Sequence, residues 1–201
     1  MIEIVTPATS TRLISIEAAR VAIGLAEDDA SQDAALEPLI DQASAAIVGF
    51  IGQPLARQTY RETVWSRLAA DSLILSRFPV ASITSVEIDG AAIAADGYLV
   101  EAATGIVHRR SPTRCGPFWP AGETVVEYAA GYELPTGLPA DIQRAAILML
   151  RQAHLASDRD PLLRSEQTDG VASFSYFAAG AAAVPLEAQA LLCPYQIPAV
   201  A

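Results

Sequence analysis

A long amphipathic helix is predicted by residues 32–54, which read QDAALEPLIDQASAAIVGFIGQP. Apolar side chains recur in it every three or four residues, as one buried helix face requires. Gly52 and Pro54 end the pattern, because glycine readily adopts the left-handed C-cap conformation and proline cannot continue a helix. Pro38 lies in the first turns, where proline is tolerated. The apolar positions are Leu36, Leu39, Ile40, Ala43, Ile47, Phe50 and Ile51.

Two further helices are predicted, one before and one well after this segment. Ser15 can cap a helix over residues 16–23. Pro139 and Asp141 are placed to open a later helix, since proline suits the first helical position and a carboxylate suits the first turn. Its apolar face continues to about Ser157.

Between these helices the hydrophobic period changes to two, which is typical of strands. The pairs Asp89-Gly90, Asp96-Gly97 and Thr104-Gly105 supply turns. Short strands joined by tight turns favour an antiparallel meander or small barrel over a βαβ sheet. The strands are expected at residues 59–65, 73–75, 82–88, 98–100, 105–108 and 124–128.

The predicted fold class is therefore α+β: a helical bundle with an inserted antiparallel β subdomain and an extended C-terminal tail. Residues 1–57 would form the N-terminal helical part and residues 58–134 the β-rich subdomain. Residues 135–177 would complete the helical part, with a polar loop over 165–175. Residues 178–201, rich in alanine and proline, would form the tail, with one helical turn around residues 186–192.

The composition of the chain argues against several classes of function, among them nucleic-acid binding. The chain has 201 residues and a formal net charge of −10, with 13 basic and 23 acidic residues. A surface that grips nucleic acid normally needs clustered basic side chains. The chain contains no lysine, which excludes a phosphate-binding P-loop lysine. Cys115 and Cys193 are far apart, and no secretory signal or membrane span is apparent, so we expect reduced thiols and assembly in the cytoplasm.

No catalytic, cofactor-binding or metal-binding residue is predicted. His108 and His154 lie in no metal-ligand spacing, and no GxSxG motif is present. The acidic loop over residues 27–33 lacks the alternating ligands of a calcium loop, so we interpret it as a solvated connection between helices. We interpret the remaining large aromatic residues as core or loop anchors rather than base-stacking platforms: Trp65, Phe118 and Trp119.

Five segments, taken in order, form a recognisable pattern. They are residues 13–19 (LISIEAA), 33–43 (DAALEPLIDQA), 47–55 (IVGFIGQPL), 138–145 (LPADIQRA) and 165–176 (SEQTDGVASFSY). In order and spacing they resemble the phage head–tail connector (adaptor) family, and the adaptor of gene transfer agents in particular.

This resemblance implies a structural protein of the virion neck, with no enzymatic activity, cofactor or membrane. It would form a ring, expected to be dodecameric, on the portal protein. Its partners would be the portal, other copies of itself and a downstream neck or stopper protein, with DNA passing through the ring. Another virion neck or tail-completion protein is the alternative, and an enzyme with an unrecognised site is a third hypothesis.

The tail carries the predicted docking residues. Residues 178–201 are apolar with a single charge, so we expect them to be covered by protein. Two interpretations remain: the tail folds back on its own domain as a strap, or it docks on a neighbouring adaptor or the portal. The proposed anchors are Leu186, Leu191, Leu192 and Tyr195.

The densest group of basic residues is Arg109, Arg110 and Arg114, which we interpret as protein-contact or salt-bridge arginines rather than phosphate contacts. Changing all three to alanine is expected to leave DNA affinity unaltered, because no phosphate-binding cluster exists there. A filter-binding titration checks this. Micromolar binding by the unaltered chain that weakens steeply with salt would contradict the prediction.

Overall fold

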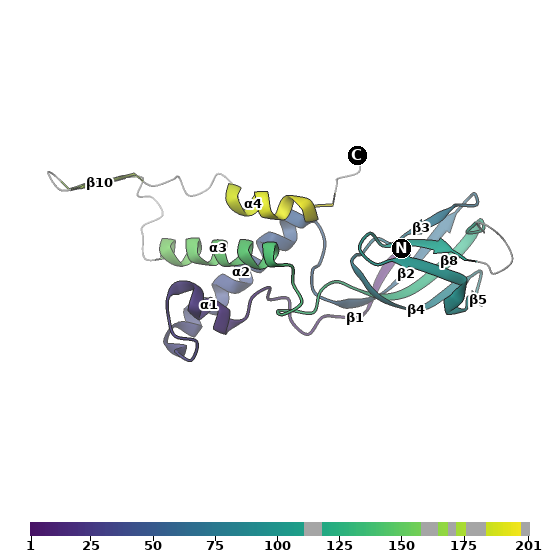
Figure 1. The fold of residues 1–201 in the computed structure, drawn as a ribbon, viewed down its shortest axis with the longest axis horizontal. Coiled ribbons are helices and arrows are strands. Elements are labelled where there is room, and N and C mark those ends of the chain that lie inside the picture. Colours follow the sequence, from purple (N-terminus) through teal and green to yellow (C-terminus); the bar gives the residue numbers. More distant parts are fainter. Residues whose placement is uncertain (111–117, 158–164, 169–171, 176–183, 198–201) are drawn as a thin grey trace. The chain divides into compact units, whose positions relative to one another are not determined.

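The chain folds as two compact units (Figure 1). The β unit contains residues 1–11 and 54–137, and the helical unit contains residues 12–53 and 138–201. Helices and antiparallel sheets together confirm the predicted α+β class. The computed structural model describes residues 1–110, 118–157, 165–168, 172–175 and 184–197.

Helix α1 (Ile16–Ile23) begins where its cap was predicted. The Ser15 side chain accepts a hydrogen bond from the Ala18 amide at 3.2 Å. This bond satisfies one of the amides that a helix leaves unpaired at its N-terminus. Gly24 ends the helix in the left-handed conformation, with φ of 91°.

Helix α2 (Asp33–Ile51) is the helix on which the helical unit is built. It packs against α1, against α3 (Ala140–Ser157) and against α4 (Leu186–Leu192). By length and apolar composition alone, the stretch Ala30–Ile51 also qualifies as membrane-spanning. One face of α2 is buried against the other helices, as is typical of a core helix. Its buried residues are Leu36, Ile40, Ala43, Ser44, Ile47 and Ile51.

The C-terminal segment has helix at the residues where one turn was expected, but its described part packs on other helices instead of being extended. Residues 186–192 form α4, which packs mainly on α3. The reason is a short apolar stripe: Ala188 and Leu192, four residues apart on one helix face, are both fully buried. Residues 178–183 and 198–201 of the expected tail lie outside the described residues.

The polar stretch expected to be a loop contains a hairpin. β9 (Ser165–Thr168) pairs antiparallel with β10 (Ala172–Ser175). Within the described residues these two strands form a separate two-stranded sheet. The polar composition of the stretch concealed the strands, because strand prediction from sequence relies on apolar alternation.

The main sheet of the β unit is antiparallel and has the strand order β1-β2-β8-β4-β5. It is not a simple meander, since β8 lies between β2 and β4. Every second residue of β8 is buried, from Thr124 to Ala130, so one face of this central strand packs on the core. The strands are β1 (Ile2–Thr6), β2 (Gln58–Ser66), β4 (Val80–Ile88), β5 (Ala91–Ala92) and β8 (Gly122–Ala130).

A second antiparallel sheet has the order β3-β7-β6. Its strands are β3 (Ser72–Ile74), β6 (Tyr98–Glu101) and β7 (Ile106–Arg109). The predicted Thr104-Gly105 turn joins β6 to β7, and Gly105 has φ of 71°, a conformation that glycine adopts without strain.

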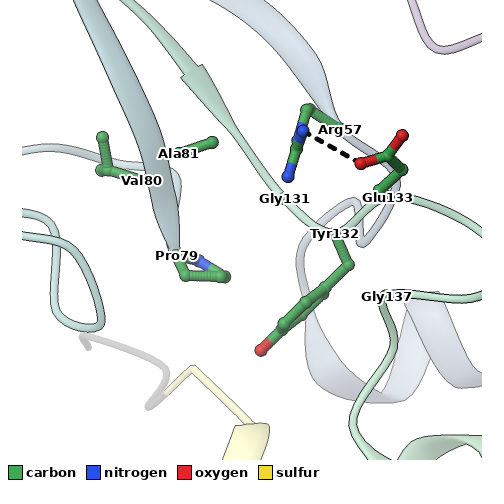
Figure 2. A pocket seen from close by; sticks show the side chains of 8 residues that line it. All are labelled: Arg57, Pro79, Val80, Ala81, Gly131, Tyr132, Glu133 and Gly137. Carbon is green, nitrogen blue, oxygen red and sulfur yellow. Dashed lines mark hydrogen bonds and ion pairs between the residues drawn. The ribbon is translucent and has the colours of Figure 1, made fainter.

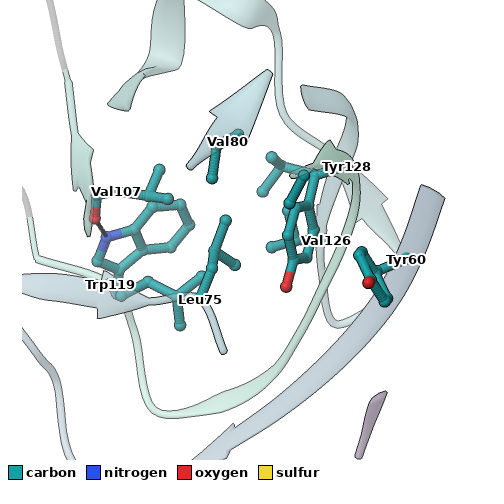
Figure 3. Close-up of a cluster of buried hydrophobic side chains, with 10 residues drawn as sticks. Tyr60, Leu75, Val80, Val107, Trp119, Val126 and Tyr128 are labelled. Atoms are coloured by element: carbon teal, nitrogen blue, oxygen red, sulfur yellow. Dashed lines mark hydrogen bonds between the residues drawn. The ribbon is translucent and has the colours of Figure 1, made fainter. Parts of the chain in front are cut away.

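Both sheets contribute to one core, shown in Figure 3. Trp119 is only 2% exposed, and its indole Nε1 donates a hydrogen bond to the Val107 carbonyl at 2.9 Å. A buried indole needs such an acceptor. Tyr60 and Tyr128 lie with ring centroids 5.8 Å apart, within the range of favourable aromatic pairs. The interpretation of Trp119 as an anchor is therefore confirmed.

The division into units differs from the expected boundaries at the N-terminus. β1 pairs with β2, so residues 1–11 group with the β unit rather than with the helices. The partner strand lies more than fifty positions along the chain, and local sequence patterns contain no information about such long-range pairing.

Two leucines of α4 provide a stability test with its own control. Leu192→Ala is expected to lower the free energy of unfolding by roughly 2–5 kcal/mol, because it leaves a cavity in the core. Leu186→Ala is expected to change it by less than about 0.5 kcal/mol, because this side chain is 81% exposed. Urea unfolding of both variants measures the difference. Equal values would contradict the packing of α4 on the helical unit.

Candidate protein-interaction site

The four predicted docking residues lie on α4 and the turn after it, in different environments. Leu192 is fully buried, whereas Leu186 is 81% exposed. Leu191 and Tyr195 are half-buried. The structure thus brings the four residues onto one short segment but separates a core leucine from an exposed one. Helical periodicity, applied to the turn expected around residues 186–192, could have separated them.

Polar contacts hold this segment on its own unit. The Ile197 amide donates a hydrogen bond to the Ile51 carbonyl at 3.1 Å, at the end of α2. The Gln196 side-chain amide donates to the Phe50 carbonyl at 3.2 Å, also at the end of α2. Burial, and then the negative charge of Asp141 at the start of α3, raise the pKa of Tyr195. Residues 184–197 therefore contact α2 and α3 of their own unit, as the strap interpretation expects. Docking on another chain stays a prediction for the side chains that the core leaves exposed.

The β unit carries a second candidate surface, which we call the apolar arm. It consists of residues 65–70 and 118–122, which run antiparallel from the ends of β2 and β8 to a bridge between Ala70 and Trp119. Exposed large apolar side chains grouped in one place are a mark of protein contact surfaces. Those of the arm are Trp65 (73% exposed), Leu68 (78%) and Phe118 (60%).

The sequence interpretation of Trp65 and Phe118 as buried or loop anchors did not foresee this exposure. Tyr60 and Glu62 on β2 are buried, and strand side chains alternate between faces. Trp65 lies an odd number of positions from both, so it points to the opposite face. The alternation of β2 could therefore have identified Trp65 as exposed.

A shallow pocket of about 290 Å³ lies at the ends of β2, β4 and β8 (Figure 2). Arg57 Nη1 lies 3.4 Å from Glu133 Oε2 across one side of it. Gly131 has φ of 103°, and a Cβ there would lie 2.7 Å from the Ala56 carbonyl oxygen, so only glycine fits this wall. The lining residues are Arg57, Pro79, Val80, Ala81, Gly131, Tyr132, Glu133 and Gly137. The pocket is at the lower size limit for small-molecule sites, and we assign it no ligand.

His108 lies in an exposed polar group on β6 and β7. Its Nε2 is 3.2 Å from Glu101 Oε1, while the Thr104 hydroxyl donates to Glu101 Oε2 at 3.0 Å. A nucleophile relay requires the hydroxyl to face the imidazole. Here both side chains bind the carboxylate instead, so the arrangement is that of a surface hydrogen-bond cluster.

The acidic loop before α2 is mostly exposed, as expected of a solvated connection, and its Asp29 caps the short 3-10 helix η1 (Ala30–Gln32). The Asp29 side chain accepts a hydrogen bond from the Ser31 amide at 3.0 Å. The Ser31 side chain, and then this amide, lower the pKa of Asp29. Arg20 forms a two-point ion pair with Asp33 at 2.5 and 2.8 Å, which lowers the pKa of Asp33. Among the residues that the structure describes, no group of three or more metal-ligating side chains is found.

A buried carboxylate joins separate strands of the β unit. Glu62, 5% exposed, accepts hydrogen bonds from the Tyr128 hydroxyl at 2.7 Å and from the Ser76 amide at 3.0 Å. Its other oxygen accepts from the Ser76 hydroxyl. Burial and the neighbouring Glu62 raise the pKa of Tyr128 far above its ordinary value, so the phenol remains a donor. The network stabilises the core because each buried polar atom has a partner.

The arginine group is divided between environments. The Arg109 guanidinium lies 5.6 Å from the centre of the Trp119 ring, within cation–π distance. The Arg110 amide donates to the Gly97 carbonyl at 2.8 Å. Arg114 lies outside the described residues. The Arg109 contact is with protein, as we predicted from the sequence.

Comparison with known proteins gives related folds. Similar chains occur in structures of the virion of the native gene transfer agent particle (23% identity, TM-score 0.61) and of its neck computed with C12 symmetry (22% identity, TM-score 0.60). Both alignments cover 100% of this chain and 97% of the other. No curated protein sequence matches the chain.

A family model provides the assignment. The model for head completion proteins matches residues 12–196, which include all of α1, α2, α3 and α4 and most of the β unit. Because this match extends over far more than half of the chain, the protein belongs to the head completion protein family.

Proposed function

We propose that this protein is a head–tail connector (adaptor) of the virion neck, which binds the portal as a ring and joins the DNA-filled head to the tail. Membership of the head completion protein family carries the proposal. The likeness of fold over the full chain to chains in structures of the gene transfer agent neck supports the location.

A ring of twelve copies is the form we propose. One of the similar neck structures was computed with C12 symmetry, which supports this number. A closed ring of identical subunits uses heterologous contacts, so each copy needs two different surfaces. The apolar arm of the β unit and the exposed side of α4 are further surfaces that the portal or the neck protein could cover.

The charge of the chain suits a passage for DNA. Twelve copies at −10 each carry a formal charge of −120. Carboxylates that face the centre of such a ring repel phosphates and prevent DNA from adhering to the wall. The partners of the ring would be the portal on the head side and a neck or stopper protein on the tail side.

The assembly state provides the direct test. Alone, the chain is expected to sediment as a monomer or weak oligomer, because copies carrying −10 each repel one another. With the portal of the same particle, electron microscopy is expected to show a ring bound to the portal. Failure to bind the portal would contradict the proposal. A stable dodecamer at low salt without portal would contradict the dependence on the portal as a template.

The exposed leucine of α4 tests whether this segment docks on a partner. The Leu186→Ser variant is expected to bind the portal about tenfold more weakly than the unaltered chain. The reason is that part of an apolar side chain, which the partner would cover in the assembly, is lost. Thermal unfolding of the variant serves as the control and is expected to match the unaltered chain, since Leu186 is 81% exposed. Unchanged binding in a surface-immobilised portal assay would remove Leu186 from the interface.

A further inference from the structure

The outer edge of β1 has backbone groups available for another strand. Met1 and Thr63 exchange both hydrogen bonds, at 2.7 and 2.8 Å, so they form a hydrogen-bonded pair of the β1–β2 ladder. In an antiparallel ladder such pairs alternate with pairs whose amides and carbonyls point away from the partner strand. Ile2 and Ile4 therefore direct their amide and carbonyl groups to the outer side. Among the described residues no strand pairs with that side.

This edge has little of the protection that edge strands usually show. Proteins protect such edges with lysine, proline, inward-pointing charges or bulges. β1 carries one charge, Glu3, and its only irregularity is a register shift between Ile4 and Thr6. Ile4 and Val5 are 57% and 50% exposed. The edge therefore combines outward-pointing backbone groups, which no described strand pairs with, and apolar side chains.

The β9–β10 hairpin of the helical unit presents the complementary feature. Within the described part of the chain its two strands pair only with each other. An isolated two-stranded hairpin is at best marginally stable in water, and further strands stabilise it. Its eight strand residues include a single charge, Glu166. Repulsion between acidic copies is therefore weak at this segment.

We propose that, in the assembled ring, the β9–β10 hairpin of one copy adds to the outer edge of β1 of the next copy and extends its five-stranded sheet. The inference rests on the proposed ring-forming function, because a closed ring needs two different surfaces that fit each other. A strand edge and a hairpin satisfy this requirement through main-chain hydrogen bonds, which depend little on side-chain identity. The occupant of the β1 edge is therefore a second copy of this chain.

Cross-linking between copies tests the contact. In a background with Cys115→Ser and Cys193→Ser, the variant carrying Ile4→Cys and Ser173→Cys is assembled on the portal and treated with a short bismaleimide. A ladder of covalent oligomers on a denaturing gel is the expected result. The matched control replaces Ile4→Cys by Ala92→Cys on β5, the opposite edge of the same sheet, and is expected to give no ladder.

The other outcomes of this experiment are decisive. A fast-migrating cross-linked monomer would show that the hairpin completes its own sheet, and linkage to the portal alone would show that the portal occupies the edge. Either result overturns the inference, as does an assembled ring without cross-links. A chain that does not co-sediment with the portal contradicts the proposed function itself, and this failure is visible before any cross-linker is added.

A backbone variant distinguishes strand addition from simple proximity. Ile4→Pro removes an outward amide and leaves the β1–β2 ladder intact, because the Ile4 amide does not face β2. Retention of copies on the portal is expected to weaken roughly tenfold, since each added strand depends on few main-chain bonds. Ile4→Ala keeps the amide and is expected to retain normal assembly, and thermal unfolding confirms that both variants fold. Normal assembly by a folded Ile4→Pro variant would overturn the proposal.

Discussion

The buried face of α2 is the constraint on which the helical unit depends. Leu36, Ile40, Ile47 and Ile51 are fully buried, and α1, α3 and α4 all pack against this helix. A face of this kind cannot be stable in water alone, because most helical stability in proteins comes from packing of the apolar face. The end of α2 is also the point at which the chain leaves for the β unit, since Gly52 adopts the left-handed conformation and Pro54 follows.

The β unit depends in a similar way on its central strand. β8 pairs with β2 on one side and β4 on the other, and it contributes Val126 and Tyr128 to the core. Tyr128 also provides the hydroxyl that satisfies the buried Glu62 carboxylate. The same strand thus supplies apolar side chains to the core and a hydrogen-bond donor to the buried carboxylate. A buried carboxylate without such donors would destabilise the fold.

The features that the two cores do not use are those expected of a component of an assembly. The apolar arm, the exposed Leu186 on α4, the outer edge of β1 and the β9–β10 hairpin all present groups that further protein contacts can satisfy. Among the described residues the polar clusters, by contrast, have internal partners: Glu101 binds His108, and Asp33 binds Arg20. This distribution of satisfied polar groups and unsatisfied surfaces agrees with a structural role in the head completion protein family.

The sequence by itself determined the elements with strong local patterns. The cap at Ser15, the end of α2 at Gly52 and the alternation of β2 and β8 follow from backbone conformation and from which face of an element is apolar. Only the tertiary structure decided which strands became neighbours, because pairing of β1 with β2, or of β8 between β2 and β4, joins residues far apart in the chain. It also decided the candidate site: Leu186 and Leu192 are the same residue type on one short helix, and only the surface of α3 beneath that helix makes one a core residue and leaves the other exposed.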